Sequence, residues 1–588
     1  MNDTTPFRPL SRRAFIGAAA VTLGAASIRP GRAGAAAANR VAVLGGGMAG
    51  LTVAHELIER GFEVTVYERK ALGGKARSIP TDLPTAGGRG PLPGEHGFRF
   101  FPGFYHNVPD TMRRIPFPGN PNGVWDNLVN APSAFVSVAG ENIIAPFGLT
   151  PELPSVLTPQ DIAQTLIGGT RIGLQVPPLE AAEFGTRMLM FLTSCDERRY
   201  GQWEYVSWLD FVRAPGKSEA YRRFLSKALT RALVAAKEQV ASARTIGNMA
   251  DAFLATLVLQ GNDGAPDRVL NLPTNEAWID PWVAHLTQLG VRFQTQVTVE
   301  SLQANGGRIA SAHARDSNGT TVRIDADWFV CAMPAERART LWDAPISALD
   351  ANLARMHGLT TDWMNGIQFY LTTDAPIIEG HLGFLDSPWA LSALNQAQFW
   401  KQRDLPRDYG DGTVHDILSV DISDWNTPGI LYGKPACDCT REEIAAEVWA
   451  QLKAGLYGDN KTLLRDDSLH SWFLDPAIQW SAADRTNTND EPLLINTAGS
   501  WDLRPSAQTN IPNLFLAGDY VRTNVDLATM EGANESGRAA ANALLDAAGS
   551  SAARARVFEL YRLPQFDAAK QIDKQRYESG LPNLLDTF

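Results

Sequence analysis

Cysteine is scarce in this chain, whose 588 residues include only Cys195, Cys331, Cys437 and Cys439. A single residue separates Cys437 from Cys439, which brings the two thiols too close for an unstrained disulfide. No C-x-x-C pair and no cluster of histidines is present, so the sequence has no metal-binding pattern. We therefore expect four free or partly buried thiols and no bound metal ion.

An excess of positive charge is also absent. The chain carries 53 Lys and Arg against 64 Asp and Glu, a net charge of −11, which argues against a general nucleic-acid-binding surface. With 44% apolar and 20% charged residues, it has the composition of a globular protein. Its length exceeds one ordinary core, so two domains are expected. No internal repeat, coiled coil, Ser-His-Asp set or paired-carboxylate set is apparent.

Long apolar runs are missing as well, and the nearest approach to one lies in residues 1–38. Ser11-Arg12-Arg13-Ala14-Phe15-Ile16 precedes an alanine-rich stretch over 17–28 and small-residue sites near 33–37. This order is typical of an export signal, and the twin arginine resembles a Tat signal. We expect Tat export to the periplasm, the cell envelope or the extracellular space. A membrane anchor is disfavoured because the run is well below about 20 strongly apolar residues.

The chain does contain a glycine-rich turn between two apolar strands. Val-Ala-Val-Leu over 41–44 is followed by Gly45-Gly46-Gly47-Met48-Ala49-Gly50, then by a helical pattern and a strand that ends at Glu68. In a dinucleotide site, Gly45 permits the tight turn and Gly47 lets the backbone approach a pyrophosphate, while Gly50 lets the helix pack closely on the sheet.

The helix that begins at Met48 and Ala49 offers its free N–H groups to the phosphates. Glu68, which lies 18 positions after Gly50, is placed to accept hydrogen bonds from ribose hydroxyls. The pattern therefore predicts a bound dinucleotide.

A second set of signals lies near the C-terminus. Residues 514–517 indicate a buried strand followed by Gly518 and Asp519, and a helical pattern rich in small residues runs over 530–545. A nicotinamide site needs only the first turn, so the second acidic strand end points to FAD. Asp519 is placed to accept a ribityl hydroxyl, and the helix that starts near Met530 directs its N-terminal dipole at the flavin.

A third piece lies between these two sets. We expect a helix and strand near 282–293, meander strands over 297–302, 308–315 and 322–326, and a buried strand over 328–334. Elsewhere we expect a helix over 221–259, a strand over 413–422 and a helix over 440–456.

The predicted fold is α/β: a Rossmann-type FAD-binding domain assembled from three chain segments, with a mixed α+β substrate domain. The predicted segments are 39–115, 271–345 and 491–548 for the FAD-binding domain, 116–270 and 346–490 for the substrate domain, and 549–588 for a C-terminal tail that either packs or stays loose.

At this point the chain resembles the FAD-dependent carotenoid (phytoene) desaturases of the flavin amine oxidase superfamily. Five stretches carry the likeness: the glycine turn with Glu68, Leu72–Ala76, Gly97–Asn107, Phe515–Tyr520 and Leu527–Ala533. They cover the cofactor domain. A looser likeness is to hydroxysqualene dehydroxylase.

The resemblance implies further cofactor contacts. It places the Gly73–Gly74 backbone against the phosphates, with Lys75 adding positive charge. It also implies contacts from Arg69, Val297, Met530 and Ala533.

The same resemblance suggests Arg99, Tyr105 and Thr529 as candidate catalytic residues. The family commonly has His where this chain has Arg99. Three roles therefore stay open for Arg99: a contact with the flavin, a contact with a polar end of the substrate, or a structural ion pair. His96 and His106 are expected to be structural.

The function implied is hydride transfer from a C–H or C–O centre of an apolar, isoprenoid or carotenoid-like substrate to FAD. Thr529 stands where flavin amine oxidases tend to have an aromatic residue of the amine cage, which disfavours but does not exclude an exported amine or amino-acid oxidase using O₂. A flavin-dependent double-bond isomerase is the third hypothesis. O₂ and quinone both stay open as electron acceptor, and an apolar substrate is compatible with peripheral membrane contact.

One apolar stretch is a candidate wall for a substrate tunnel. Residues 384–391, with Phe399 and Trp400, are rich in aromatic side chains. Ordinary core packing explains the same pattern equally well.

Overall fold

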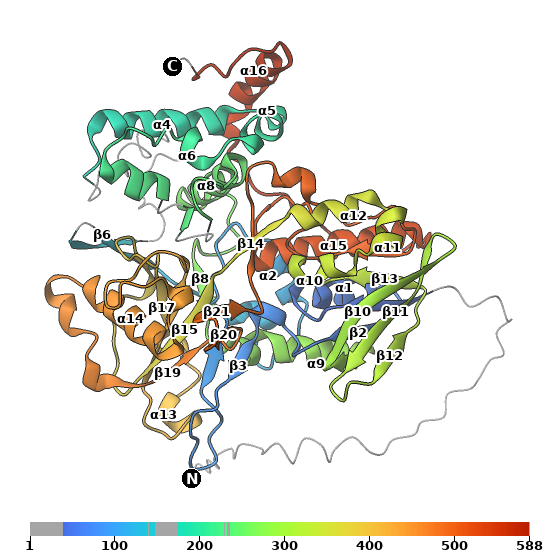
Figure 1. Ribbon diagram of the computed structural model, residues 1–588, viewed down its shortest axis with the longest axis horizontal. Coiled ribbons are helices and arrows are strands. Elements are labelled where there is room, and N and C mark those ends of the chain that lie inside the picture. The colour runs from blue at the N-terminus through green and yellow to red at the C-terminus, as the bar shows by residue number, and fades with distance from the viewer. Residues whose placement is uncertain (1–38, 139, 147–174, 228–229, 232–235, 587–588) are drawn as a thin grey trace, which may run out of the picture. The chain divides into compact units, whose positions relative to one another are not determined.

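The computed structural model describes residues 39–138, 140–146, 175–227, 230–231 and 236–586 (Figure 1). The export signal predicted for residues 1–38 lies outside these ranges. Within them, no helix is both long enough and apolar enough to cross a membrane.

A five-stranded parallel sheet carries the glycine turn. In spatial order its strands are β23 (Leu514–Leu516), β13 (Trp328–Cys331), β1 (Arg40–Leu44), β2 (Glu63–Glu68) and β9 (Arg292–Thr295). β13 and most of β1 are buried, as expected for strands of a parallel sheet covered on both faces. Three separated chain segments supply this one sheet, so the predicted fold class is confirmed.

Two helices from opposite ends of the chain pack together on this sheet. Helix α1 (Met48–Ile58) contacts β1, β2 and α15 (Met530–Ala547), and α15 also contacts β23. A Cβ atom at Gly537 would lie 2.8 Å from the Ala49 carbonyl oxygen. Glycine in α15 therefore permits the close approach of the two helices, and the helix predicted from Met530 is present.

The segment between these helices also matches its predicted pattern. Helix α9 (Asp280–Leu289) precedes β9, and β10 (Val297–Asn305), β11 (Arg308–Asp316) and β12 (Thr321–Ile324) form an antiparallel meander. Three short helices follow β13: α10 (Ala335–Ala338), α11 (Ala344–Leu349) and α12 (Ala351–Arg355).

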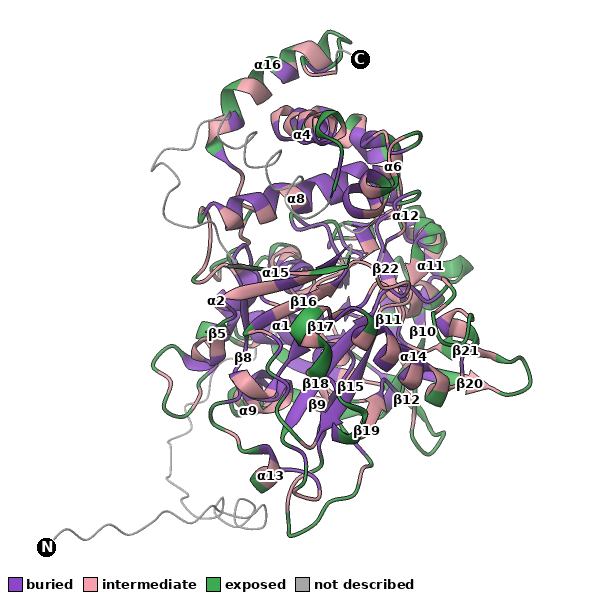
Figure 2. Cartoon of the chain, turned by 90° about the vertical axis from the view of Figure 1, so that its left-hand side faces the viewer, coloured by how far each residue is buried: buried purple, intermediate pink, exposed green. Residues whose placement is uncertain are grey.

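A second sheet has seven strands. In spatial order they are β19 (Leu469–Leu474), β15 (Asn365–Leu371), β18 (Asp416–Ile422), β17 (Ser392–Asn395), β16 (Gly380–Phe384), β6 (Ser133–Val138) and β7 (Glu141–Pro146). β15 and β18 are buried along their whole length (Figure 2). Helix α14 (Arg441–Ala454) packs against β19 and begins at a capping box formed by Thr440 and Glu443. The strand and the helix predicted here are both present.

Four further sheets have two strands each. They are β3 (Ser78–Pro80) with β4 (Pro93–Glu95), β5 (Leu128–Asn130) with β8 (Arg268–Leu270), β14 (Thr360–Asp362) with β22 (Leu493–Ile495), and β20 (Ile478–Ser481) with β21 (Thr486–Asn489).

Helices dominate residues 175–260, namely α4 (Pro178–Thr193), α5 (Asp196–Gly201), α6 (Trp208–Phe211) and α8 (Ala243–Leu257). The prediction of one helix over 221–259 is wrong. A π-helical segment covers Tyr221–Lys227, and α8 begins only at Ala243. The helix is interrupted because the Ala241 carbonyl accepts the Trp208 N–H and Ser242 caps α8 through the Thr245 N–H.

The C-terminal tail packs rather than staying loose. Its helix α16 (Asp567–Glu578) contacts α4 and α5. The buried Asp573 carboxylate accepts hydrogen bonds from the Cys195 N–H at 2.9 Å and from Arg198 Nε at 3.0 Å.

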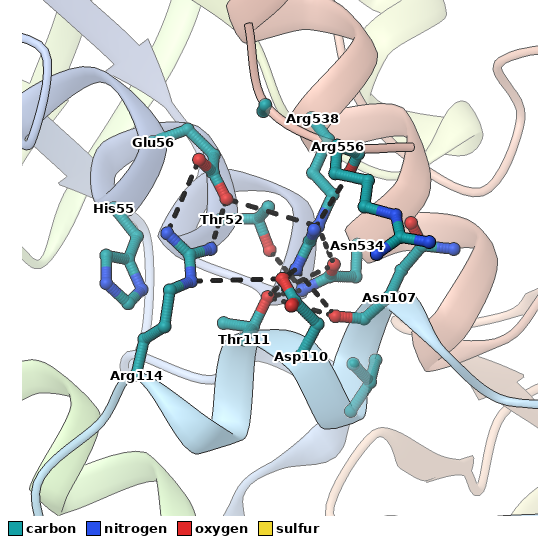
Figure 3. A network of polar contacts seen from close by, with 12 residues as sticks. Thr52, His55, Glu56, Asn107, Asp110, Thr111, Arg114, Asn534, Arg538 and Arg556 are labelled. Carbon is teal, nitrogen blue, oxygen red and sulfur yellow. Dashed lines mark hydrogen bonds and ion pairs between the residues drawn. The ribbon is translucent and has the colours of Figure 1, made fainter. Parts of the chain in front are cut away.

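A buried polar network joins α1, α2 (Asn107–Arg113) and α15 (Figure 3). Arg538 of α15 has a side chain only 1% exposed and lies 2.8 Å from the Asp110 carboxylate. It donates to the Asn107 carbonyl and to Thr111 Oγ1, both at 2.7 Å. The Glu56 carboxylate of α1 lies 4.0 Å from Arg538. The network thus ties the first cofactor segment to the last.

Replacing Arg538 tests this connection. We expect Arg538→Met to lower the free energy of unfolding by about 2–3 kcal/mol, because it removes the donor to the buried Asn107 carbonyl and Thr111 hydroxyl. The exposed Arg554, which pairs with Asp546, gives the control Arg554→Met, with an expected loss below about 1 kcal/mol. Chemical denaturation of both variants measures the difference. Equal, small losses would contradict the assignment.

Candidate functional site

The turn after β1 contains glycines with different physical requirements. Gly45 has φ +116°, and a Cβ atom at Gly50 would lie 2.0 Å from the Gly45 carbonyl oxygen. Gly47 has an ordinary φ of −78°, and the atom that a Cβ there would meet within 4 Å is the Gly74 Cα, at 3.7 Å. Neither backbone conformation nor packing among the described residues requires glycine at 47. A glycine at this position is what the predicted approach of a phosphate to the backbone would require.

The start of α1 is open to such a ligand. No side chain caps the helix at Gly47, so the first-turn N–H groups, including those of Met48 and Ala49, are left for an anion.

A second glycine pair packs directly on this turn. The Gly73 N–H donates to the Gly46 carbonyl at 2.8 Å. A Cβ atom at Gly74, where φ is +56°, would lie 2.9 Å from the Gly47 Cα. The structure therefore brings Gly73 and Gly74 to the phosphate turn, where the sequence predicts them.

The Glu68 carboxylate also reaches back to the turn. Its Oε2 accepts the Gly46 N–H at 2.8 Å, and its Oε1 accepts the Lys70 N–H at 2.7 Å. This geometry places the acid beside the turn, as the ribose assignment requires.

Three other predicted cofactor residues have protein partners nearby. Lys75 pairs with Glu336 at 3.1 Å, and Arg69 pairs with Asp490 at 2.8 Å. Val297 is buried at the start of β10, just beyond the pairing of β9 with β2. The two cations are therefore engaged with carboxylates in this structure.

The C-terminal half of the site lies where β23 ends. Gly518 has φ +144°, and its N–H donates to Ser536 Oγ at 2.8 Å. The Asp519 side chain is partly exposed, and no hydrogen bond joins its carboxylate to the described part of the chain. Because β1 and β23 run parallel, Gly45 and Asp519 follow the same edge of the sheet.

Arg504 supports this strand end and was missed by the sequence reasoning. The buried guanidinium donates to the carbonyls of Asp519 at 2.9 Å and Tyr520 at 3.0 Å and pairs with Asp526. No sequence motif marks Arg504, because the hydrogen-bond partners of its guanidinium lie 15–22 positions further along the chain.

Helix α15 begins beside the second half of the site. Thr529 Oγ1 accepts the Gly532 N–H at 3.0 Å and so caps the helix. Met530 and Ala533 lie in the first turn and are partly exposed. The helix therefore starts at the predicted residue, with its N-terminal dipole at this edge.

Glu531, also in the first turn, holds the two halves together. Its buried carboxylate accepts the N–H groups of His106 at 2.8 Å, Asn107 at 2.6 Å and Val108 at 2.8 Å. These groups form the N-terminus of α2. The sequence motif containing Glu531 was recognised, but this role was not predicted.

The candidate catalytic residues do not form one cluster. Tyr105 is buried, and burial raises its pKa above the ordinary value for tyrosine, with the charge of Glu531 adding to the effect and the Thr529 side chain opposing it. Arg99 instead donates from Nη2 to the Lys75 carbonyl at 3.1 Å and lies 3.8 Å from Glu95.

A second carboxylate lies near Arg99. Asp421 of β18 is buried, and a Cβ atom at Gly97 would lie 2.5 Å from its Oδ1. Burial raises the pKa of Asp421 to about 7, although the charge of Arg99 opposes the rise. The segment after β4 therefore contacts a carboxyl group that stays protonated well above its usual range.

The two groups of residues predicted as a possible tunnel wall, 384–391 and Phe399 with Trp400, have different surroundings. Phe384, Trp389 and Leu391 belong to the core under the second sheet, whereas residues 385–388 and 390 are partly exposed. Phe399 and Trp400 instead line a small cavity of about 10 Å³ together with Arg99.

The two flanking histidines have structural partners, as predicted. His96 Nδ1 lies 2.5 Å from Asp475, and His106 Nε2 lies 2.9 Å from the Gly261 carbonyl oxygen. All four cysteines are free.

The fold brings together three possible metal ligands from two distant parts of the sequence, which were not predicted. Ligand-type atoms of His55, Glu59 and His285 lie within 4.8 Å of one another. Trp282 Nε1 donates to His55 Nδ1 at 3.1 Å, so His55 Nε2 carries the proton that faces Glu59 at 3.0 Å. A ligating histidine normally donates from its second nitrogen. The hydrogen bonds therefore favour a Trp–His–Glu chain over metal coordination.

The sequence of most of this chain is similar to sequences of known proteins. Residues 48–545 match the family described as flavin containing amine oxidoreductase. A carotenoid phi-ring synthase of Streptomyces griseus is 25% identical over 521 residues, which cover 86% of this chain and 87% of that protein. A zeta-carotene desaturase of Synechocystis sp. is 25% identical over 551 residues, which cover 86% and 97%.

The solved structures show the same fold. Cyclohexylamine oxidase from Brevibacterium oxydans IH-35A aligns with a TM-score of 0.56 at 15% identity, covering 87% of this chain and 99% of that one. Putrescine oxidase aligns with a TM-score of 0.54 at 13% identity, covering 86% and 99%.

Two glycine substitutions separate cofactor binding from folding. We expect Gly47→Ala to leave the melting temperature of the apoprotein nearly unchanged and to weaken FAD binding about 10-fold or more, because the new methyl group faces the phosphate path. Gly50→Ala should instead destabilise the apoprotein, since its Cβ meets the Gly45 carbonyl. Flavin fluorescence titration and thermal melting measure the two effects. Wild-type FAD affinity in Gly47→Ala would refute the phosphate assignment.

Asp421 should make stability depend on pH. The native state keeps its proton up to a pKa of about 7, whereas the unfolded chain releases it near the ordinary value of 3.8. Asp421 therefore makes wild-type stability fall as pH rises from about 4 to about 7. Asp421→Asn should flatten this dependence, and exposed Asp325→Asn should not. Urea denaturation across this range provides the measurement, and parallel curves for wild type and Asp421→Asn would contradict the prediction.

Proposed function

The chain belongs to the family of flavin-containing amine oxidoreductases and is an FAD-dependent oxidoreductase, and within this family we propose that it takes a hydride from an apolar, isoprenoid-like substrate. The observation that carries the proposal is the similarity to two carotenoid-named relatives over 86% of the chain. This similarity covers both sheets rather than the cofactor segments alone.

The residue before Met530 supports the same choice. Thr529 caps α15, because its hydroxyl oxygen accepts the Gly532 N–H at 3.0 Å. A flavin amine oxidase tends to place an aromatic cage residue at this position. The threonine hydroxyl instead has a structural role here, which favours a desaturase-type reaction over amine oxidation.

The residues present fit FAD. Gly47 has no reason within the protein to be glycine, and the start of α1 provides N–H groups for the pyrophosphate. We propose that Glu68, which lies beside the glycine turn, binds the ribose, and that Asp519, Met530 and the start of α15 bind the other half of the cofactor.

When bound, FAD supplies the hydride acceptor, so the chain's own residues mainly bind and orient the substrate. Tyr105 stays protonated because burial raises its pKa, so it acts at this edge as a hydrogen-bonding group rather than as a base. Phe104, which is also buried, packs edge-on against Tyr105 with the ring centroids 5.3 Å apart.

Export and electron transfer complete the proposal. We propose that residues 1–38 direct Tat export, a route that carries folded protein with its cofactor already inserted. The electron acceptor is O₂ or a quinone, and the substrate is apolar enough for peripheral contact with a membrane.

Anaerobic flavin reduction tests the proposed function. We expect the flavin absorbance of the purified holoenzyme to bleach when detergent-dispersed acyclic isoprenoid hydrocarbons are added, and to stay unchanged with cyclohexylamine or putrescine. Analysis of the reacted isoprenoid should show a new double bond.

Two outcomes would contradict this proposal. Bleaching by amines alone would indicate an amine oxidase. Conversion of the isoprenoid without bleaching and without an acceptor would indicate an isomerase.

A further inference from the structure

An apolar surface groove lies between helix α14 and strand β19, at one edge of the second sheet. Its volume is about 360 Å³, within the range of about 300–1,000 Å³ over which proteins take up ligands. One wall is a face of α14, and the rest is formed by Phe369, Leu431, Leu469 and Trp472. The groove is therefore large enough to take apolar side chains from a partner.

The α14 wall is one face of the helix with opposite charges at its two ends. Its residues follow the spacing i, i+3, i+4, i+7, i+8 and i+11: Glu442, Ala445, Ala446, Trp449, Ala450 and Lys453. At 1.5 Å per residue, the two charged positions lie about 16 Å apart along the helix axis. The other face of α14 is buried in the core of the second sheet. The groove face is thus acidic at one end, basic at the other and apolar between them.

A fixed turn extends this apolar surface. Ile430, Leu431 and Tyr432 are 53%, 53% and 41% exposed. The buried Glu447 carboxylate of α14 accepts the N–H groups of all three residues, at 2.5, 2.8 and 3.1 Å. These bonds hold the backbone of the turn, so three large apolar side chains stay at the surface. A contiguous exposed apolar patch of this kind marks an interaction surface.

The charges around the groove favour a protein partner over an anionic membrane. Lys453 pairs with Asp466 at 2.7 Å, and Lys434 pairs with Glu443 at 2.7 Å, so neither lysine adds a net positive charge. Glu442 is exposed, and the whole chain carries a net charge of −11. Anionic lipid headgroups attract clusters of unpaired basic residues, and the described residues around this groove form no such cluster.

We propose that this face is the interface of a homodimer, in which α14 packs antiparallel on α14 of a second copy across a two-fold axis. In such an isologous contact each pairing occurs twice. Glu442 then faces Lys453 of the second copy, and the same register sets Ala446 against Trp449. Each large side chain meets a small one and each charge meets its opposite, so the face is complementary to itself.

The existing partner of Lys453 does not prevent this contact. Asp466 is 74% exposed, and such a surface ion pair contributes little to stability. Lys453 is therefore available to Glu442 of the second copy. None of these residues belongs to the cofactor site, so the inference does not depend on the proposed function, and the flavin reduction assay tests that function separately.

Charge reversal tests the interface and its register. Sedimentation equilibrium of the purified holoenzyme gives the Kd of the dimer. We expect Glu442→Lys to raise this Kd about 10-fold, because it sets lysine against lysine at two symmetry-related places. Lys453→Glu should act in the same direction. The double variant Glu442→Lys/Lys453→Glu restores both opposite-charge pairs and should return the Kd to within about 3-fold of wild type.

Two further variants separate the interface from general effects. Ala446→Glu places a charge against Trp449 of the second copy and should raise the Kd at least about 10-fold. The matched control Glu559→Lys reverses an exposed charge outside the groove and should leave the Kd within about 2-fold of wild type. The flavin spectrum and the melting temperature report whether each variant is folded.

Four results would overturn the inference. A wild type that stays monomeric at every concentration would do so without any variant. A dimer that Ala446→Glu leaves intact would use another surface. A double charge variant that stays as weak as the single variants would contradict the antiparallel register. A monomeric wild type that sediments with phosphatidylcholine vesicles, and loses this binding in Leu431→Ser, would assign the face to a membrane.

Discussion

The Glu531 carboxylate is the contact on which the rest of the site depends. It lies in the first turn of α15 and accepts three consecutive backbone N–H groups at the start of α2. A carboxylate in this position satisfies donors that a helix N-terminus leaves unpaired and interacts favourably with the helix dipole. One side chain from the end of the chain thereby fixes the backbone of the first segment. Arg538, about two turns further along α15, repeats the connection in the buried network.

This connection explains why the cofactor site can be assembled from distant segments. α15 lies against α1 through Gly537, and α1 starts at the turn that presents Gly47 to the phosphates. The same helix α15 starts at Thr529, next to Tyr105 on the loop that leads into α2. The pyrophosphate turn and the flavin-side residues therefore hold fixed positions relative to one another, which a cofactor spanning both halves requires.

The sequence predicts the parts of this structure that local rules determine. The glycine turn, Glu68, the strand ending at Gly518 and the helix from Met530 each follow from spacing and residue type. What could not be predicted depends on distant partners. The break in 221–259 arises from a hydrogen bond between Trp208 and Ala241. Lys75 carries the expected charge, but its partner Glu336 lies 261 positions away. His55 and His285 meet only because α1 and α9 pack together.

Charge balance links the unusual residue at position 99 to its surroundings. Glu95 and Asp421 both face Arg99 in a buried region, so one guanidinium stands against two carboxyl groups. Burial raises the pKa of both acids, which favours their neutral forms and reduces the negative charge buried around Arg99. A neutral histidine at position 99 would leave both acids without a cation. Arginine at this position and the two acids therefore form one electrostatic unit, and the buried region around them tolerates these charges because they largely neutralise one another.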